Sequence, residues 1–460
     1  MQNNSQTNEM GTGSIPKLFF KLAIPAVVAQ VVNLLYNIVD RIFIGHIPEI
    51  GAAALTGVGL FNAMLMLITA FSMLGGAGGA PLASIALGKN DKEQAEKIMT
   101  NSFLLLIIFS IILSIVLYIF APNLLTMFGA SEVTLPYAVD YARIYVLGSV
   151  FVLIVTGMNP FVTTQGFAKI AMMTTVIGAI INIVLDPIFI FVLGMGVKGA
   201  ALATVLSQAV GAIWILKFLT GDKTVLKLRK ENMKLDPKIF GPSLALGISP
   251  FIMVSTESLL SISFTTSLAK YGGDLAVGAM TIITSINMLV TMPLQGFTQG
   301  GQPIMSYNYG AGNVDRVKKA FFMQFGVCVA YATLFWGLCM LMPNVLAGIF
   351  TTDAALAEYG SWAIRIYMAG IFSLGFQNSC QQSFMALGQA KSSLILAFLR
   401  KLILLIPLIF ILPNFFADKV FGVFVAEPVS DIIAAAITTI AFFTKFKKIM
   451  AKNGTAQTAK

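Results

Sequence analysis

The sequence predicts an all-α integral membrane protein with twelve transmembrane helices arranged as two similar six-helix bundles. Three observations lead to this prediction. Of the 460 residues, 57% are hydrophobic and only 11% are charged, which is too little charge to cover a soluble protein of this length. Residues 50–88, 102–131 and 275–314 contain no Lys, Arg, Asp or Glu. Segments of the first half also recur in the second half at a constant offset.

The long apolar runs are interpreted as helices because a helix needs about 20 apolar residues to cross a bilayer. Lipid-facing backbone must also satisfy its own hydrogen bonds, and a helix does so within one segment. The predicted spans are residues 17–44, 53–80, 98–121, 137–158, 168–193, 199–219, 242–269, 276–303, 319–342, 360–386, 393–414 and 420–444.

The net charge of +10 could indicate a nucleic-acid partner, but its distribution argues against one. Most Lys and Arg residues fall at the two ends of the chain or in even-numbered loops. That bias is typical of cytoplasmic segments, so both termini are predicted to be cytoplasmic in a bacterial inner membrane. The same basic segments favour contact with anionic lipid head groups.

An internal repeat relates the two halves at an offset of 222 residues. The matched positions are Gly79 and Gly301, Pro81 and Pro303, Ser84 and Ser306, Gly88 and Gly310, Arg143 and Arg365, and Gly166 and Gly388. The offset spans six helices, so the halves have the same orientation and should be related by a two-fold axis along the membrane normal. This arrangement favours a carrier over a channel, because simple channels more often surround a pore with identical subunits.

The predicted organisation has five parts, and we expect a monomer. They are a disordered cytoplasmic N-terminus (1–16), an N-terminal bundle (17–219), a cytoplasmic linker (220–241), a C-terminal bundle (242–446) and a basic cytoplasmic tail (447–460).

The sequence shows no catalytic constellation. The three cysteines are scattered without metal-ligand or redox spacing. No Walker A or Rossmann glycine pattern is present. We therefore expect no enzymatic activity and no cofactor, with an ion gradient supplying the energy for transport.

Polar stripes mark the candidate cation site of the first half. In the first span, Tyr36, Asn37 and Asp40 recur at helical spacing. Asn182 and Asp186 lie one turn apart in the fifth span. Two carboxylates close together in a low-dielectric site cannot both ionise easily, so such a pair can load a proton or hold a small hard cation. In the alternative interpretation, Asp40 only caps the first helix and pairs with Arg41, but this leaves Asp186 unexplained.

The second half carries a different set of polar residues. Glu257 is the only carboxylate of the seventh span, and it is interpreted either as functional or as a satisfied structural group. Glutamines at helical spacing suit a water-filled cavity or plain interhelical hydrogen bonding; they include Gln295, Gln299 and Gln381. Arg400 and Asp431 lie at similar predicted depth, so they are expected to form a structural ion pair, with Glu427 beside them.

Three segments resemble the multidrug and toxic compound extrusion (MATE) family of cation-coupled efflux carriers. They are NIVDRIFIG at 37–45, GGAPLASIALGKND at 78–91 and INIVLDPIFI at 181–190. The resemblance covers residues 17–445, and the sub-branch resembles bacterial exporters of the MepA type.

The resemblance implies roles for individual residues. Asp40, Asn182, Asp186 and Thr204 fall on the family's first-half cation site, where a proton or Na+ would bind. Tyr36, Tyr141 and Asn159 fall on positions that line the same cavity. Pro25 matches the proline at which the first helix bends. Glu257 resembles the glutamate of a second-half cation site, but the tenth span lacks the matching aspartate.

The resemblance implies a multidrug antiporter that exports amphipathic, often cationic, organic compounds in exchange for H+ or Na+. Two alternatives remain open: an exporter of one dedicated metabolite, and a lipid-linked saccharide flippase of the same superfamily. A flippase would need a strongly basic lateral cavity, and few lysines or arginines lie within these spans.

Overall fold

The computed structural model describes residues 9–351 and 353–458, and it is helical almost throughout this part of the chain. The elements of the first half are α2 (Ile15–Gly45), α3 (Gly51–Gly88), α4 (Lys92–Met127), α5 (Leu135–Leu147), α6 (Ser149–Thr164), α7 (Ala168–Pro187), η1 (Ile188–Val192) and α8 (Val197–Thr220). After the short turn η2 (Lys230–Asn232), those of the second half are α9 (Pro237–Gly310), α10 (Val314–Leu341), α11 (Pro343–Phe350), α12 (Ala354–Tyr367), η3 (Met368–Gly370), α13 (Ser373–Ala386), α14 (Ala390–Phe398), η4 (Leu399–Leu405), α15 (Ile406–Ile411), η5 (Leu412–Asn414) and α16 (Lys419–Thr458).

Each of the twelve predicted spans lies on one helix, on part of the long helix α9, or on a run of consecutive helical elements. By length and composition, nine helices of the described chain could cross a membrane, or ten if the bent pair α5 and α6 forms one span. One of these, α9, is really two helices, because Gly273 has non-helical dihedrals (φ 61°, ψ −157°). The tenth predicted span is the sequence α12, η3 and α13, broken by the 3-10 turn Met368–Gly370.

The structure differs from the prediction at the helix ends. α3 and α4 run several residues beyond their predicted spans. The fourth span is bent by 57° where α5 meets α6. No loop separates the seventh and eighth spans, since the chain reverses at Gly273 alone, where glycine accepts a positive φ at little cost.

The predicted disordered N-terminus is ordered over its second part. Residues 9–12 are helical and Met10 is buried. Arg316 donates to the backbone oxygens of Met10 (3.0 Å) and Gly13 (2.8 Å), which fixes this segment on the second half. Residues 1–8 of the prediction lie outside the described residues. The predicted tail is also helical, because α16 continues to Thr458, whereas residues 459–460 are not described.

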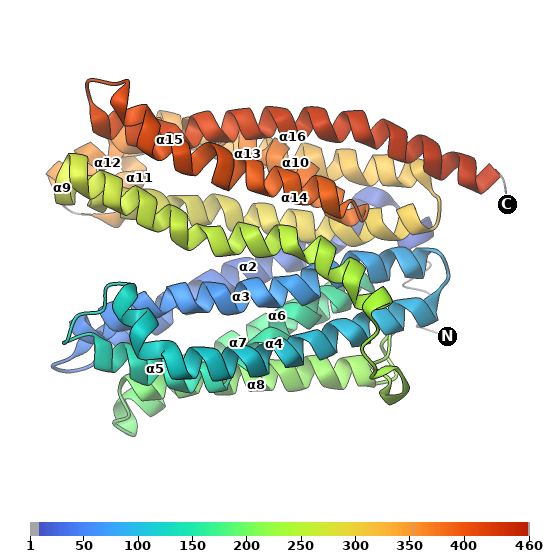
Figure 1. Cartoon of the computed structure of the whole chain (residues 1–460), viewed down its shortest axis with the longest axis horizontal. Coiled ribbons are helices and arrows are strands. Elements are labelled where there is room, and N and C mark those ends of the chain that lie inside the picture. The colour runs from blue at the N-terminus through green and yellow to red at the C-terminus, as the bar shows by residue number, and fades with distance from the viewer. Residues whose placement is uncertain (1–8, 352, 459–460) are drawn as a thin grey trace.

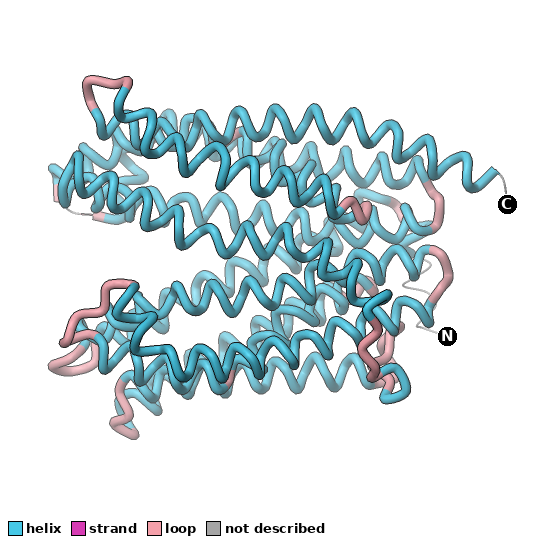
Figure 2. Tube along the Cα trace, in the orientation of Figure 1, coloured by secondary structure: helices cyan, strands magenta, loops and turns pink. Residues whose placement is uncertain are grey.

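The two halves form separate helical layers that meet near one end (Figure 1). In that view, the helices of the two halves lie close together toward the chain ends and diverge at the opposite end. Loops and turns gather at the two ends of the bundle (Figure 2). Each half has its own apolar core, and a third cluster joins residues 10–23 to residues 304–450 at the end where the halves meet.

Glycines set the contact between the halves. A Cβ atom on Gly88 of α3 would lie 2.0 Å from the backbone oxygen of Tyr307 in α9. A Cβ atom on Gly310 of α9 would lie 2.0 Å from the backbone oxygen of Ile85 in α3. The pairs are reciprocal, since Gly310 and Tyr307 are the repeat positions of Gly88 and Ile85. Reciprocal contacts are the signature of a two-fold axis, and small residues let membrane helices approach this closely.

We predict that Gly88→Ala destabilises the protein by about 1–3 kcal/mol, the usual cost of overpacking. The added methyl group would meet a backbone carbonyl that cannot move independently of its helix. Thermal unfolding in detergent would measure the effect. Gly59→Ala is the matched control in the same helix, because a Cβ atom there meets nothing within 4 Å. Equal melting temperatures for the two variants would contradict the close contact.

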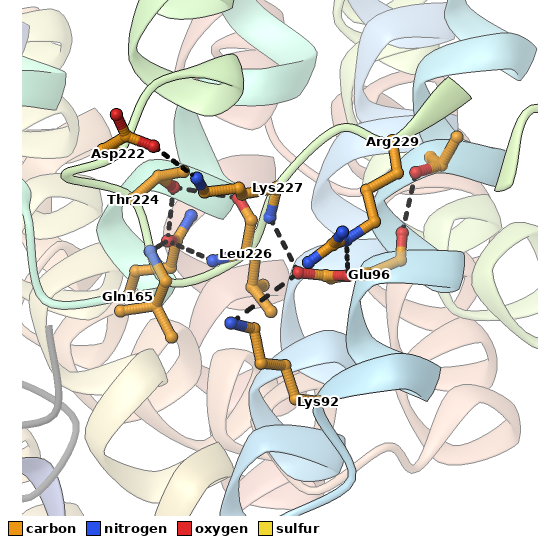
Figure 3. A network of polar contacts seen from close by, with 10 residues as sticks. Lys92, Glu96, Gln165, Asp222, Thr224, Leu226, Lys227 and Arg229 are labelled. Carbon is orange, nitrogen blue, oxygen red and sulfur yellow. Dashed lines mark hydrogen bonds and ion pairs between the residues drawn. The ribbon is translucent and has the colours of Figure 1, made fainter. Parts of the chain in front are cut away.

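The linker is held on the first half by buried polar side chains (Figure 3). Gln165 accepts hydrogen bonds from the backbone of Val225 (2.7 Å) and Leu226 (2.8 Å). Glu96 accepts from the backbone of Lys227 (3.1 Å) and pairs with Arg229 (2.9 Å). The segment leading into the second half is therefore anchored on the first half, whereas residues 9–13 lead into the first half and are anchored on the second.

We predict that Glu96→Ala makes the linker open more often. Losing two hydrogen bonds to a buried carboxylate lowers the free energy of local opening, so trypsin should cleave at Arg229 and Lys230 roughly tenfold faster. Limited proteolysis followed by mass spectrometry would measure the rates. Glu93→Ala is the control, because Glu93 lies one turn away on the exposed side of α4. Unchanged cleavage in Glu96→Ala would show that the anchor contributes little.

Candidate functional site

The first-half carboxylates meet between α2 and α7. Asp40 and Asp186 are both buried, and their carboxyl groups lie within hydrogen-bonding reach of each other. Two ionised carboxylates contain only acceptors, so this contact is attractive only when a proton or another cation lies between them. The alternative in which Asp40 only caps its helix does not fit, because α2 continues to Gly45 and the carboxyl group faces Asp186.

Asn182 connects this pair to α8. Its amide nitrogen donates to Asp186 (3.2 Å) and lies 3.3 Å from the Thr204 hydroxyl oxygen. Thr204 donates in turn to the backbone oxygen of Ala200 (3.0 Å). The four predicted cation-site residues are therefore brought together by three helices.

Several oxygens of this cluster have no donor among the described residues. They are Asp40 Oδ1, Asn182 Oδ1 and Asp186 Oδ2. A buried polar atom without a partner costs free energy, so each such atom in a folded protein needs an explanation. All three are acceptors, and their chemistry suits a proton or a small hard cation.

Tyrosines enclose the cluster on one side. Tyr141 stacks on Tyr145 with ring centroids 6.0 Å apart, and its hydroxyl lies within reach of Thr204. Tyr36 is half-buried on α2. Asn37 donates to the backbone of its own helix, to Asn33 (2.6 Å), and Asn159 donates to the backbone oxygen of Ala171 (3.1 Å). The Asn159 side-chain oxygen is also buried without a donor in the described chain.

Two prolines shape the helices that carry the carboxylates. Pro25 is buried inside α2, where it removes a backbone hydrogen bond at the predicted bend. Pro187 ends α7 directly after Asp186, and the chain continues as the π-helix η1. Short π-helical segments are frequent at functional sites.

In the second half, Glu257 is paired with Lys401, a residue that the sequence analysis did not single out. The Lys401 ammonium donates to the Glu257 carboxylate, joining α9 to η4. Lys401 directly follows Arg400, and this run of two basic residues in an apolar segment was the available signal. In a regular α-helix, neighbouring residues point about 100° apart, so the sequence favours only one inward side chain.

The predicted pair Arg400 and Asp431 is present. Arg400 donates through Nε (2.9 Å) and Nη2 (2.8 Å) to Asp431, and Glu427 lies 3.9 Å away. These three side chains are almost fully buried.

The predicted glutamines differ from one another. Gln295 and Gln299 are exposed, and Gln299 lies 3.5 Å from the Gln30 amide of the first half. Gln381 is buried and donates to the backbone oxygen of Ser393 (2.9 Å). This contact fits interhelical hydrogen bonding, and the place of Gln381 in a substrate cavity stays a prediction.

The chain is similar in sequence and in fold to a group of known proteins. The family model described as MatE matches residues 25–188 and 250–411, more than half of the chain. The chain is 24% identical over 430 residues to the multidrug export protein MepA of Staphylococcus haemolyticus (strain JCSC1435), covering 92% of this chain and 93% of that protein. It is 25% identical over 433 residues to MepA of Staphylococcus aureus (strain N315), with the same coverage. A crystal structure described as MATE in the bent conformation superposes with a TM-score of 0.91 at 24% identity, covering 97% and 99% of the two chains.

We predict that reversing either charge of the Arg400 and Asp431 pair lowers folded yield, and that reversing both restores it. Leaving one buried charge unpaired costs about 3–5 kcal/mol. Fluorescence-detected size-exclusion chromatography would measure the yield of Arg400→Asp, Asp431→Arg and the double variant. Single reversals of the exposed pair Lys198 and Asp140 are the control, because surface pairs contribute about 0–1 kcal/mol. A double variant no better than the single ones would count against the pairing.

Proposed function

The chain belongs to the MatE family, and from that premise we propose that it is a secondary active multidrug efflux antiporter. It would export amphipathic, often cationic, organic compounds in exchange for H+ or Na+. The names of the staphylococcal relatives support multidrug export. The buried Asp40 and Asp186 pair, with unsatisfied oxygens around it, is the observation that carries the exchange.

The proposed coupling follows from the charge of this cluster. A proton or Na+ at Asp40 and Asp186 neutralises the site, and α2 can then bend at Pro25. An organic cation competes for the same negative charge, so the two ligands weaken each other's binding by the same free energy. Tyr36, Tyr141 and Asn159 would contact the substrate beside the carboxylates.

The moving parts would be the two bundles, residues 17–219 and 242–446, with the linker and the tail on the cytoplasmic side. Rocking of one bundle against the other about their pseudo-two-fold axis gives alternating access. We propose that the protein works as a monomer in the bacterial cell membrane. Exposed side chains such as Ile111, Ile112 and Ile115 of α4 would contact lipid.

We predict that Asp40→Asn and Asp186→Asn each abolish gradient-driven efflux while the protein stays folded and inserted. The amide keeps the shape of the carboxyl group, but it carries no negative charge that a proton or Na+ could neutralise. Glu257→Gln should reduce efflux less. Dye efflux from everted vesicles, driven in turn by a pH gradient and by a sodium gradient, would measure this and identify the coupling ion.

Asp140→Asn is the matched control, because Asp140 lies in the same half but on the exposed surface. Normal efflux in Asp40→Asn with none in Glu257→Gln would move the coupling site to the second half. Transport of a single compound among a chemically varied panel would favour the dedicated metabolite exporter.

A further inference from the structure

The Glu257 and Lys401 pair joins a half-exposed anion to a buried cation. The Glu257 side chain is 48% exposed, whereas the Lys401 side chain is 7% exposed. The carboxylate can therefore be reached from outside the protein, and the ammonium approaches it from the interior.

This pair belongs to a larger charged cluster, which we call the second-half cluster. It consists of Glu257, Arg400, Lys401, Glu427 and Asp431, with Glu257 and Lys401 acting electrostatically on Glu427. Three carboxylates face two cations. The cluster therefore has one more carboxylate than it has basic side chains, and charge balance at this depth favours one additional monovalent cation.

The cluster occupies the helices that correspond to those of the first-half site. Asp40, Asp186 and Thr204 come from the first, fifth and sixth spans, and the second-half cluster comes from the seventh, eleventh and twelfth. The repeat-related tyrosines Tyr145 and Tyr367 accompany the two clusters, and the Tyr367 hydroxyl lies within reach of Glu427. The first-half carboxylates have no basic side chain of their own cluster, so they are available to an external cation. The second-half carboxylates are paired with Arg400 and Lys401.

A π-helical segment allows the consecutive residues Arg400 and Lys401 both to point into the second-half bundle. η4 covers Leu399–Leu405 and contains both Arg400 and Lys401. The wider turn carries an extra residue, so two consecutive side chains can point into the same bundle. Arg400 then pairs with α16 while Lys401 pairs with α9.

We propose that Glu257 and Lys401 form a binding site for organic cations, in which Lys401 is a built-in competitor that sets the charge selectivity. This inference rests on the proposed function and names the substrate class of the second half. A lipophilic monovalent cation binds at Glu257 by replacing the Lys401 ammonium. Neutral compounds cannot replace it, because they offer no charge to the carboxylate.

When a bound cation displaces the Lys401 ammonium from Glu257, the ammonium still has a carboxylate to interact with. Lys401 already interacts electrostatically with Glu427, so the displaced ammonium would still be attracted by a carboxylate of the cluster. The exchange therefore conserves the number of charge contacts in the cluster. Because a ligand must displace the Lys401 ammonium from Glu257, only ligands with a positive charge and enough apolar surface bind there.

Equilibrium binding of tetraphenylphosphonium to the purified full-length protein tests this proposal without an ion gradient. Triphenylphosphine oxide serves as the neutral probe of similar shape. Lys401→Met should bind tetraphenylphosphonium about tenfold more tightly, equivalent to ~1.4 kcal/mol, with no gain for the neutral probe. Lys401→Arg keeps the competing charge and should not show the gain. Adding Glu257→Gln to Lys401→Met should remove it.

Lys391→Met is the matched control, because it removes an exposed positive charge from α14, the helix that leads directly into η4. Lys401→Gln is the second variant if Lys401→Met has a lowered melting temperature. An unchanged or weaker affinity of folded Lys401→Met and Lys401→Gln for tetraphenylphosphonium, or an equal gain for the neutral probe, overturns the inference while leaving the proposed function intact. If the wild-type protein binds neither tetraphenylphosphonium nor ethidium, the proposed multidrug function fails, and this inference fails with it.

Discussion

The cost of placing a charge inside a bilayer constrains this structure more than any other interaction. On insertion scales, a charged residue at the centre of a membrane helix costs about 2.5–3.5 kcal/mol. The two halves meet that cost differently. The second half pairs Arg400 with Asp431 and Lys401 with Glu257, using basic side chains of its own. The first half brings Asp40 against Asp186 and leaves buried acceptor oxygens without a donor in the described chain. In the proposed function, a bound cation neutralises this cluster, so its occupancy would respond to an ion gradient.

The two halves differ in how their charges are paired, but the internal repeat gives them the same helix arrangement. Gly88 and Gly310 pack reciprocally across the contact between the halves, so each half presents the same helices to the centre. The segments that lead into each half are anchored on the other half, through Arg316 in one case and Glu96 in the other. The helices of the two halves converge toward the chain ends and diverge at the opposite end (Figure 1). The geometry suits two bodies that move about one connected end.

Helical spacing predicted more of the contacts in the first-half site than in the second half. Asn182 and Asp186 are one turn apart, so any helix places them together, and the family resemblance added Asp40 and Thr204. Lys401 was missed because α-helical spacing directs neighbouring side chains apart, and the π-helical segment η4 cannot be read from composition. The role of Gln381 could not be decided from the sequence, because its spacing fits a cavity wall and a helix contact equally well. In the structure it donates to the backbone oxygen of Ser393.

The sequence by itself determined the all-helical membrane fold, the positions of the twelve spans and the relation between the halves. These follow from local hydrophobicity and from a fixed offset, which depend on the order of residues alone. The tertiary structure decided which charges meet, because contacts such as Glu257 with Lys401 join residues 144 positions apart. It also decided that residues 9–13 are ordered, since their order depends on Arg316 from a distant helix. Pairing between helices depends on their rotation and depth, and neither is encoded in any single segment.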